Sequence, residues 1–437
     1  MKKSIRIFIC TGCFFLLLVS WVVASHSLSA AEKQLLLINE AADMMNEGIY
    51  IKAVPLLEEA AGYNSSHTIF AEQELKRAYL ALIDKRGFPR KYKTLLEKQL
   101  SRKDAEPSIY IEAAEYYLST SKTQEALELL RNGVKKTGDI RVINLYESAR
   151  YAYEVSRPAF ENVTAIFNQT IQVQQSGKWG IADDDGVIII PCIYDKVSNF
   201  NKDRVLVRYG ESIYAVDRDN NKVSVAGKEI NDFRNYADNR VPISLNGNWI
   251  RATGEFELGS SMFEDIGMYF GGYAAAKING KWGVIDLTDK WLVPAEYDEI
   301  ILDELGRCFA QETVFVRSGN AVHLFTNGVL SEEQYEAARP FGDEGFAAVK
   351  QNGKWGFIDI HGNEMIAFIY DDALSFGQHL AAVKIGDYWG YISLRGELVI
   401  ETVFYEAKSF SGGSAPVLTN RGWQIITLLE YKKGVSL

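Results

Sequence analysis

The chain has 437 residues, of which 47% are hydrophobic and 24% are charged, proportions that are typical of globular proteins and exclude wholesale disorder. A chain of this length exceeds what one hydrophobic core usually serves, so we expect at least two domains. The formal net charge of −10 argues against a nucleic-acid partner, because such binding relies on Lys and Arg to replace the counterions of the phosphate backbone.

Residues 1–31 have the pattern of an export signal. Three basic residues precede an uncharged run over residues 7–24, and small residues at 29–31 suit cleavage by a signal peptidase. The same run is just long enough to stay in the bilayer as a signal anchor. Lipidation at Cys10 or Cys13 is disfavoured, because the apolar core follows both. We therefore expect an exported protein, extracellular or in the cell envelope, whose only membrane contact is an uncleaved N-terminal segment.

Residues 32–156 are expected to form a helical domain, because apolar residues recur there at spacings of three and four. Two stretches, 41–60 and 114–133, resemble tetratricopeptide helical hairpins. The resemblance rests on small residues where paired helices approach closely, at Ala41, Ala53, Ala60, Ala114, Ala126 and Gly133. A degenerate unit is expected between them, around Ala78, Ala81, Leu95 and Leu96. The resemblance implies a concave face that grips a peptide or partner protein; a helical bundle without a groove is the alternative.

Residues 157–165 are expected to be a linker, and residues 166–437 carry a repeat. Trp-Gly recurs in one register, at Trp179-Gly180, Trp282-Gly283, Trp355-Gly356 and Trp389-Gly390, with a lone Trp at 249 and 423. Two weaker copies have Ile213 and Val322 in the Trp position. Successive Trp positions lie 33 to 40 residues apart, with a usual period near 34. Such self-similarity indicates a repeat array rather than one enzyme core.

Each repeat is expected to hold about three short antiparallel strands. An Asn-Gly pair such as Asn279-Gly280 precedes the Trp strand and predicts a tight hairpin. The strand after the Trp strand ends in an aromatic residue followed by an acid, with the aromatic position assigned to Tyr194, Tyr297, Tyr370 and Tyr405. We expect the Trp ring to pack one unit on the next, beside a Gly that lets backbone approach. The array would hold about seven units and a partial one.

These motifs resemble the WG-repeat (KWG-repeat) family of bacterial proteins, over about 250 residues of the chain. The resemblance implies an all-β scaffold without a defined reaction. A period near 34 is shorter than the 40 to 45 residues, roughly, of a common four-stranded propeller blade. The expected fold is therefore α+β and multidomain, with a tetratricopeptide-like helical module followed by an open curved solenoid in preference to a closed propeller-like ring. Pairing of residues 166–174 with 423–429 would close the ring.

We predict no catalytic, cofactor-binding or metal site. The five histidines lack metal-ligand spacing, and His361 is expected on an exposed turn. Asp183-Asp184-Asp185-Gly186 lacks the remaining ligands of a calcium loop and is expected to be a turn. Cys192 and Cys308 are more than three repeats apart, so no bridge between them is expected, and Cys192 is interpreted as a small buried residue.

Acidic residues recur beside the aromatic position of successive units, as at Asp195, Asp298 and Asp371. Glycoside hydrolysis needs one special carboxylate pair, whereas these acids recur, so we interpret them as structural. The favoured function is an exported, non-enzymatic scaffold that binds protein or peptide partners at the bacterial cell envelope and needs no cofactor. The alternative is an envelope protein that binds or hydrolyses glycans, with exposed aromatics such as Trp291 stacking on sugar rings.

Overall fold

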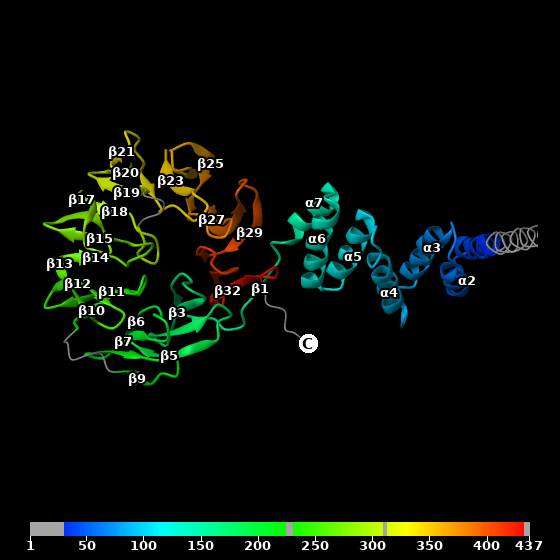
Figure 1. The fold of residues 1–437 in the computed structure, drawn as a ribbon, viewed down its shortest axis with the longest axis horizontal. Coiled ribbons are helices and arrows are strands. Elements are labelled where there is room, and N and C mark those ends of the chain that lie inside the picture. Colours follow the sequence, from blue (N-terminus) through cyan, green and yellow to red (C-terminus); the bar gives the residue numbers. More distant parts are fainter. Residues whose placement is uncertain (1–29, 224–229, 309–312, 432–437) are drawn as a thin grey trace, which may run out of the picture. The chain divides into compact units, whose positions relative to one another are not determined.

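The computed structural model describes residues 30–223, 230–308 and 313–431, so the predicted signal or anchor lies almost wholly outside them. The chain divides into two compact units, Met1–Tyr146 and Glu147–Leu437 (Figure 1). The first unit is helical and the second consists of strands. Among the described helices, none combines the length and apolar character that a membrane crossing requires.

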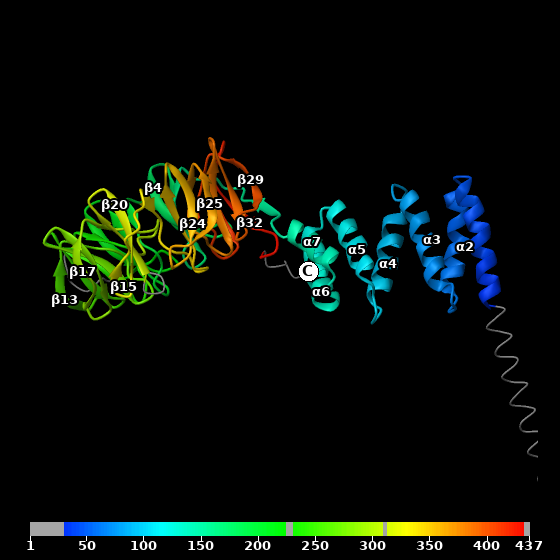
Figure 2. The ribbon, with the colours of Figure 1, turned by 90° about the horizontal axis from the view of Figure 1, so that it is seen from above.

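The helical unit begins with helical residues 30–46, and its later helices pack in chain order (Figure 2). They are α2 (Tyr50–Gly62), α3 (Thr68–Ala81), α4 (Phe88–Leu100), α5 (Pro107–Ser119), α6 (Thr123–Thr137) and α7 (Ile140–Ala149), which crosses the boundary between the units. The small residues that the sequence places at close helix approaches are buried: Ala41, Ala53, Ala60, Ala114, Ala126 and Gly133. The expected intervening unit folds as α3 and α4, with Ala78 buried and Ala81 exposed.

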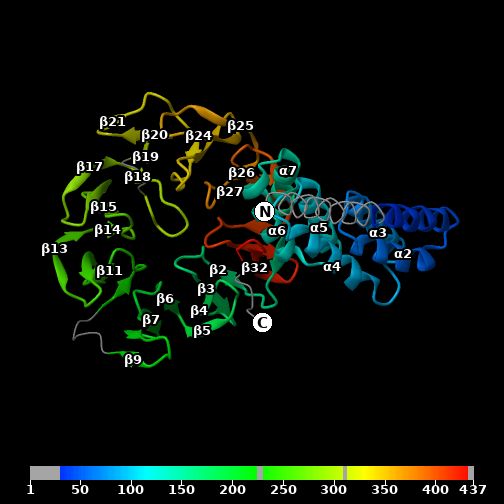
Figure 3. The same ribbon diagram turned by 45° about the vertical axis from the view of Figure 1, so that its right-hand side comes forward.

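The second unit is a ring of eight four-stranded antiparallel sheets, which we number as blades 1 to 8 (Figure 3). Blades 1 to 4, each from the innermost strand outward, comprise β2 (Asn162–Val163), β3 (Thr170–Gln175), β4 (Lys178–Asp183), β5 (Ile188–Tyr194); β6 (Lys196–Val197), β7 (Val205–Tyr209), β8 (Ser212–Val216), β9 (Lys222–Val223); β10 (Asp232–Phe233), β11 (Arg240–Leu245), β12 (Asn248–Thr253), β13 (Leu258–Phe263); and β14 (Asp265–Ile266), β15 (Tyr273–Ile278), β16 (Lys281–Asp286), β17 (Trp291–Tyr297).

Blades 5 to 8 follow the same order. They comprise β18 (Glu299–Ile300), β19 (Thr313–Ser318), β20 (Ala321–Thr326), β21 (Val329–Leu330); β22 (Ala337–Ala338), β23 (Ala347–Gln351), β24 (Lys354–Ile358), β25 (Glu364–Tyr370); β26 (Asp372–Ala373), β27 (Leu380–Ile385), β28 (Tyr388–Ser393), β29 (Leu398–Phe404); and β30 (Glu406–Ala407), β31 (Ser414–Thr419), β32 (Gly422–Leu428), β1 (Tyr153–Val155).

The prediction of three strands per repeat was wrong, because each repeat also contains a fourth, innermost strand. In every blade this strand is only two residues long, too short to give a periodic hydrophobic pattern. Short inner strands and tight turns explain how a four-stranded blade fits into about 34 residues. The predicted hairpin turns are present: Asn279 and Gly280 have φ angles of 52° and 75°, the pair of positive values that a type I′ turn requires.

The prediction of an open solenoid was also wrong, because the ring is a closed eight-bladed propeller. The early strand β1 completes blade 8 by pairing with β32, with Glu154 opposite Thr427. Ser156 extends this junction, since its N–H donates to the Ile425 oxygen at 2.7 Å and its hydroxyl accepts from the Ile425 N–H at 2.9 Å. Closure thus uses residues 153–156, whereas the sequence suggested that a closed ring would need pairing of 166–174 with 423–429.

The domain boundary shifts accordingly. The sequence places residues 32–156 in the helical domain and 157–165 in a linker, but β1 lies at the end of the first range and β2 within the second. Both strands belong to the propeller, which therefore starts before the repeat pattern becomes visible and holds eight blades instead of about seven and a partial unit.

We predict that Ser156→Pro destabilises the propeller by about 2–4 kcal/mol, because it removes both hydrogen bonds to Ile425, each of which costs about 1–3 kcal/mol when a buried partner is left unsatisfied. Ser156→Ala removes only the hydroxyl and is expected to cost about 1 kcal/mol. Urea unfolding of the full-length chain measures both. Unchanged unfolding of the Pro variant would show that this junction does not hold the ring.

Candidate interaction surface of the propeller

Each tryptophan of the repeat packs against the next blade around the ring. Trp179 packs on a hydrophobic cluster shared by blades 1 and 2, and Trp282 packs on one shared by blades 4 and 5. Trp249, Trp355 and Trp389 make the corresponding contacts to blades 4, 7 and 8. Trp423 of blade 8 packs on Val163 and Val173 of blade 1. The same interaction therefore joins neighbouring blades and also joins the last blade to the first.

The Gly that follows the Trp lets the outermost strand pass close to the Trp strand. A Cβ atom on Gly180 would lie 2.4 Å from the Ile190 oxygen, and one on Gly283 would lie 2.4 Å from the Val293 oxygen. Gly356 and Gly390 are similarly close to the backbone of their outer strands. The ladder shifts register at this point, between Trp179 and Ile181 for example. The repeated Gly is thus needed for this close approach.

The aromatic position of the repeat lies opposite the Trp in the outermost strand. Tyr194, Tyr297 and Tyr370 pair there with Trp179, Trp282 and Trp355. In blade 7, however, Phe404 pairs with Trp389, and Tyr405 is 51% exposed. The prediction for Tyr405 is thus displaced by one residue, and Phe404 restores the regular spacing of six to Phe410.

The recurrent acids hold the junctions between blades. Asp371 accepts from the Lys354 ammonium of blade 6 at 2.5 Å and from the Gly386 N–H of blade 7 at 2.7 Å. Asp195 and Asp298 make the same pair of contacts at their own junctions. The lysine hydrogen bond, followed by the backbone donor, lowers the pKa of all three carboxyl groups. These acids are placed to connect blades.

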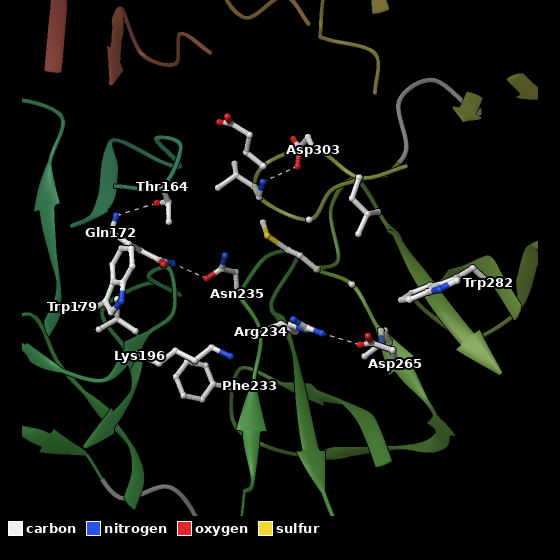
Figure 4. Close-up of a pocket in the computed structure, with 18 residues that line it drawn as sticks. Thr164, Gln172, Trp179, Lys196, Phe233, Arg234, Asn235, Asp265, Trp282 and Asp303 are labelled. Carbon is white, nitrogen blue, oxygen red and sulfur yellow. Dashed lines mark hydrogen bonds and ion pairs between the residues drawn. The ribbon is translucent and has the colours of Figure 1, made fainter. Parts of the chain in front are cut away.

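A chamber of about 640 Å³ lies on the inner side of blades 1 to 5 (Figure 4). The half-buried indoles of Trp179 and Trp282 lie on opposite sides of it. Between them are Lys196 and Phe233, with Lys196 5.0 Å from the Phe233 ring. Arg234 pairs with Asp265 at 3.0 Å across the boundary of blades 3 and 4. The chamber therefore combines open aromatic surface with paired charges.

Residues 302–306 of blade 5 separate this chamber from a second cavity of about 560 Å³, because part of the same segment lines both. The segment belongs to residues 301–312, which join β18 to β19, whereas only residues 267–272 join the equivalent strands β14 and β15. Leu305 packs on Ala165 and Phe167 of blade 1, which is opposite blade 5 in a ring of eight. Figure 3 shows this loop projecting toward the centre of the ring. It forms a partition.

One ion pair to another blade and hydrogen bonds within the loop hold the partition. Glu304 accepts from the Lys408 ammonium of blade 8 at 3.2 Å, and Asp303 accepts from the backbone N–H of Leu305 and Arg307 within its own loop. The Glu304 side chain lines the cavities and is 30% exposed, with protein around the rest of it. This enclosure raises the pKa of its carboxyl group, while Lys408 opposes the rise.

Comparison with protein families gives matches to one model, described as the WG containing repeat, at residues 179–211, 261–282, 282–303, 327–355, 355–389 and 389–423. The C-terminal region carries WG repeats. No curated protein matches the chain. The WG repeats are interrupted at residues 212–260 and 304–326, and these two stretches supply Phe233, Arg234 and the Glu304–Gly306 part of the partition.

Solved structures similar to this chain include Kluyvelomyces marxianus Hsv2, with 12% identity and a TM-score of 0.35 over 60% of this chain and 97% of that one. The Myceliophteria thermophila Cps50 (Swd1) beta-propeller domain has 9% identity and a TM-score of 0.32 over 63% and 99% of the two chains. The Neurospora crassa Pan2 WD40 domain has 11% identity and a TM-score of 0.32 over 63% and 89%.

Other residues singled out in the sequence lie outside the chamber. His361 is exposed on a turn, and Asp183 accepts from the N–H groups of Asp185 and Val187, so this acidic run is a turn. Cys192 is half-buried, and both it and Cys308 are free thiols. Burial raises the pKa of Cys308 to about 12. Nothing in the sequence pattern marked Lys196, Phe233 or Asp265 as chamber residues, although the 40-residue spacing marked the partition loop.

We predict that the propeller loses stability as the pH falls below about 4, the usual pKa of Asp. A lowered folded-state pKa contributes stability that is present above the unfolded pKa and is lost as the pH falls through the folded one. Asp371→Asn should therefore lower the melting temperature at pH 7 and weaken its acid dependence. Thermal unfolding from pH 7 to pH 3 measures both, with Glu401→Gln, an exposed acid, as control. Equal acid dependence in wild type and Asp371→Asn would contradict this account.

Proposed function

We propose that this protein is an exported, non-enzymatic scaffold that binds protein partners at the cell envelope of a bacterium. The observation that carries the proposal is the chamber on the inner side of blades 1 to 5, where two indoles of the repeat are half open. An open, concave, mainly apolar surface with a few polar groups is the usual form of a binding site. A closed ring holds such a surface rigid.

The assignment of the acids supports binding over turnover. Asp195, Asp298 and Asp371 each connect two blades and have lowered pKa values, whereas a general acid needs a raised one. Glu304 has a raised pKa, but its carboxylate pairs with Lys408 and its sequence neighbour Asp303 bonds within the loop. These five acids thus each have a structural partner, which supports a structural role for them over a catalytic one.

Export is proposed from the basic, apolar and small-residue pattern of residues 1–31. The helical unit is proposed to act as a tetratricopeptide-like module, because small buried residues such as Ala41 and Ala114 recur where its helices pack closely. Two repeat modules in one chain would offer two separate surfaces to envelope partners.

A glycan ligand is the second candidate, favoured by the two half-open indoles, since aromatic rings also stack on sugars. Trp291, which the sequence suggested as a sugar-stacking residue, packs between blades 3 and 4, with its ring 6.2 Å from the Phe263 ring. Trp179 and Trp282 therefore replace it in this alternative.

The proposal is tested in bacterial cells by placing a photo-crosslinking amino acid at Asn279, on the exposed hairpin of blade 4. The full-length chain should be digested by protease added outside the cytoplasmic membrane and should give adducts with other proteins. Leu16→Arg with Leu17→Arg interrupts the apolar run and should abolish both results. A wild-type chain that stays protected inside the cytoplasm, or that crosslinks only to itself, would refute the proposal.

A further inference from the structure

We propose that the chamber binds a short basic segment of a partner protein and that a Lys or Arg side chain of this segment lies on the open indole of Trp179 or Trp282. The inference rests on the proposed scaffold function and names the ligand of its propeller. It starts from a difference between repeats that otherwise share one design.

In three blades the repeat supplies its own cation to the tryptophan. The residue that follows the innermost strand lies over the ring, with Arg234 4.6 Å from the Trp249 ring, Arg339 5.1 Å from the Trp355 ring and Lys408 5.1 Å from the Trp423 ring. Such contacts are favourable because the face of an indole ring is negative. The repeat itself therefore shows which group this face accepts.

Blades 1 and 4 lack this cation. Thr164 and Gly267 occupy the equivalent positions, directly after Val163 and Ile266. Thr164 uses its hydroxyl locally, donating to the Ala165 oxygen at 3.1 Å, and Gly267 has no side chain. Lys277, from the neighbouring strand, reaches only to 6.0 Å from the Trp282 ring.

These two rings, without a cation from the innermost strand, face the same space. Trp179 and Trp282 both line the chamber, together with Thr164 and Gly267, whereas the covered Trp249 does not line it. Trp355 and Trp423, which carry a cation, are 5% exposed, and Trp389, which shares a hydrophobic cluster with Leu374, is 7% exposed. Trp249 is half-buried although Arg234 lies over its ring. Trp179 and Trp282 remain half-buried. A cation of the ligand would take the place over the indole ring that Arg234, Arg339 and Lys408 fill in their own blades.

The net charge of the chain favours a basic ligand. Its lining carries three carboxylates, Asp265, Asp303 and Glu304, and two cations, Lys196 and Arg234. Both cations have acidic partners, since Lys196 pairs with Asp232 at 2.8 Å and Arg234 pairs with Asp265 at 3.0 Å. The whole chain carries a formal charge of −10. The three carboxylates are paired in turn, with Arg234, Arg307 and Lys408. A basic segment is therefore attracted at long range by the net charge of the chain.

The partition limits what can enter. Residues 302–306 form part of the chamber wall and so reduce the space open to a ligand. A volume of about 640 Å³ is within the range of small-ligand sites and suits a chain end or loop rather than a folded domain. Apolar side chains such as Val197, Ile266 and Met268 line the remaining wall, which suits a peptide better than a sugar.

The test uses a library of random linear peptides displayed on phage, selected on the full-length chain. Enriched peptides should contain Lys or Arg, and replacing Arg by uncharged citrulline in the synthetic peptide should weaken binding about tenfold or more. Gly267→Arg and Thr164→Arg place a cation over the indole in the same way as Arg234, so each should compete with the peptide and the double variant should abolish binding.

Val187→Arg is the matched control, because it adds the same side chain to an exposed turn of blade 1 outside the chamber. It should bind peptide like wild type, and thermal unfolding should show each variant folded. A Cβ atom on Gly267 would lie 3.3 Å from the Gly306 oxygen, so Gly267→Arg could disturb the fold. If that variant does not fold, the result for Thr164→Arg decides the test.

Three results would overturn the proposal: enriched peptides without basic residues, undiminished binding by folded Thr164→Arg, or no enriched peptide while cell-wall polysaccharide is retained. The last result would assign the chamber to a glycan. Protein adducts from Asn279 in cells that persist alongside any of these results would leave the scaffold function standing and refute only the chamber as its site.

Discussion

Packing of a repeat tryptophan at the junction with the following blade, in six of the eight blades, is the interaction on which the propeller depends. A blade with a two-residue inner strand has little core of its own, and burying a ring of this size is worth about 3 kcal/mol or more. Linear repeat arrays need special end units to cover their last hydrophobic face. Here Trp423 covers blade 1 and β1 completes blade 8, so the two ends of the array protect each other.

The same repeat fixes its other polar groups. The lysine of Gly-Lys-Trp-Gly and the acid of the next junction pair with each other, and the acid also caps a hairpin of the next blade, as in Lys354, Asp371 and Gly386. Because these polar groups pair with each other, side chains free to form a specific site are found where the repeats differ in sequence. The chamber lies at such differences: Thr164 and Gly267 in place of a cation, and the longer loop of blade 5. Lys408 shows how these differences are connected. Arg234 and Arg339 pair with the Asp that begins the inner strand of the next blade, but blade 1 has Asn162 there, and Lys408 pairs instead with Glu304 of that loop.

The sequence predicted the Trp positions, the Asn-Gly hairpins and the helical unit, because each depends on residues close together in the chain. It could not reveal the inner strands, which are too short for periodicity, or β1, whose partner β32 lies at the other end of the propeller. The choice of an open solenoid followed from a short repeat period and failed because the turns are tight. Tyr405 fits the predicted motif because an acid, Glu406, follows it directly, and only the strand register shows that Phe404 lies opposite Trp389. The 40-residue spacing before Val322 recorded the partition loop, but its place inside the ring depends on packing with blade 1.

The most direct test of the closed ring is a disulfide between Glu154→Cys and Thr427→Cys. These residues face each other in the β1–β32 ladder, and opposed positions of antiparallel strands have Cα separations that a disulfide can span. Oxidation of the double variant should give a monomer with one new internal bridge, seen by faster migration in a non-reducing gel and by peptide mass, and absent from either single variant. An open array would keep these residues far apart, so failure to form the bridge, or bridges only between chains, would contradict the account.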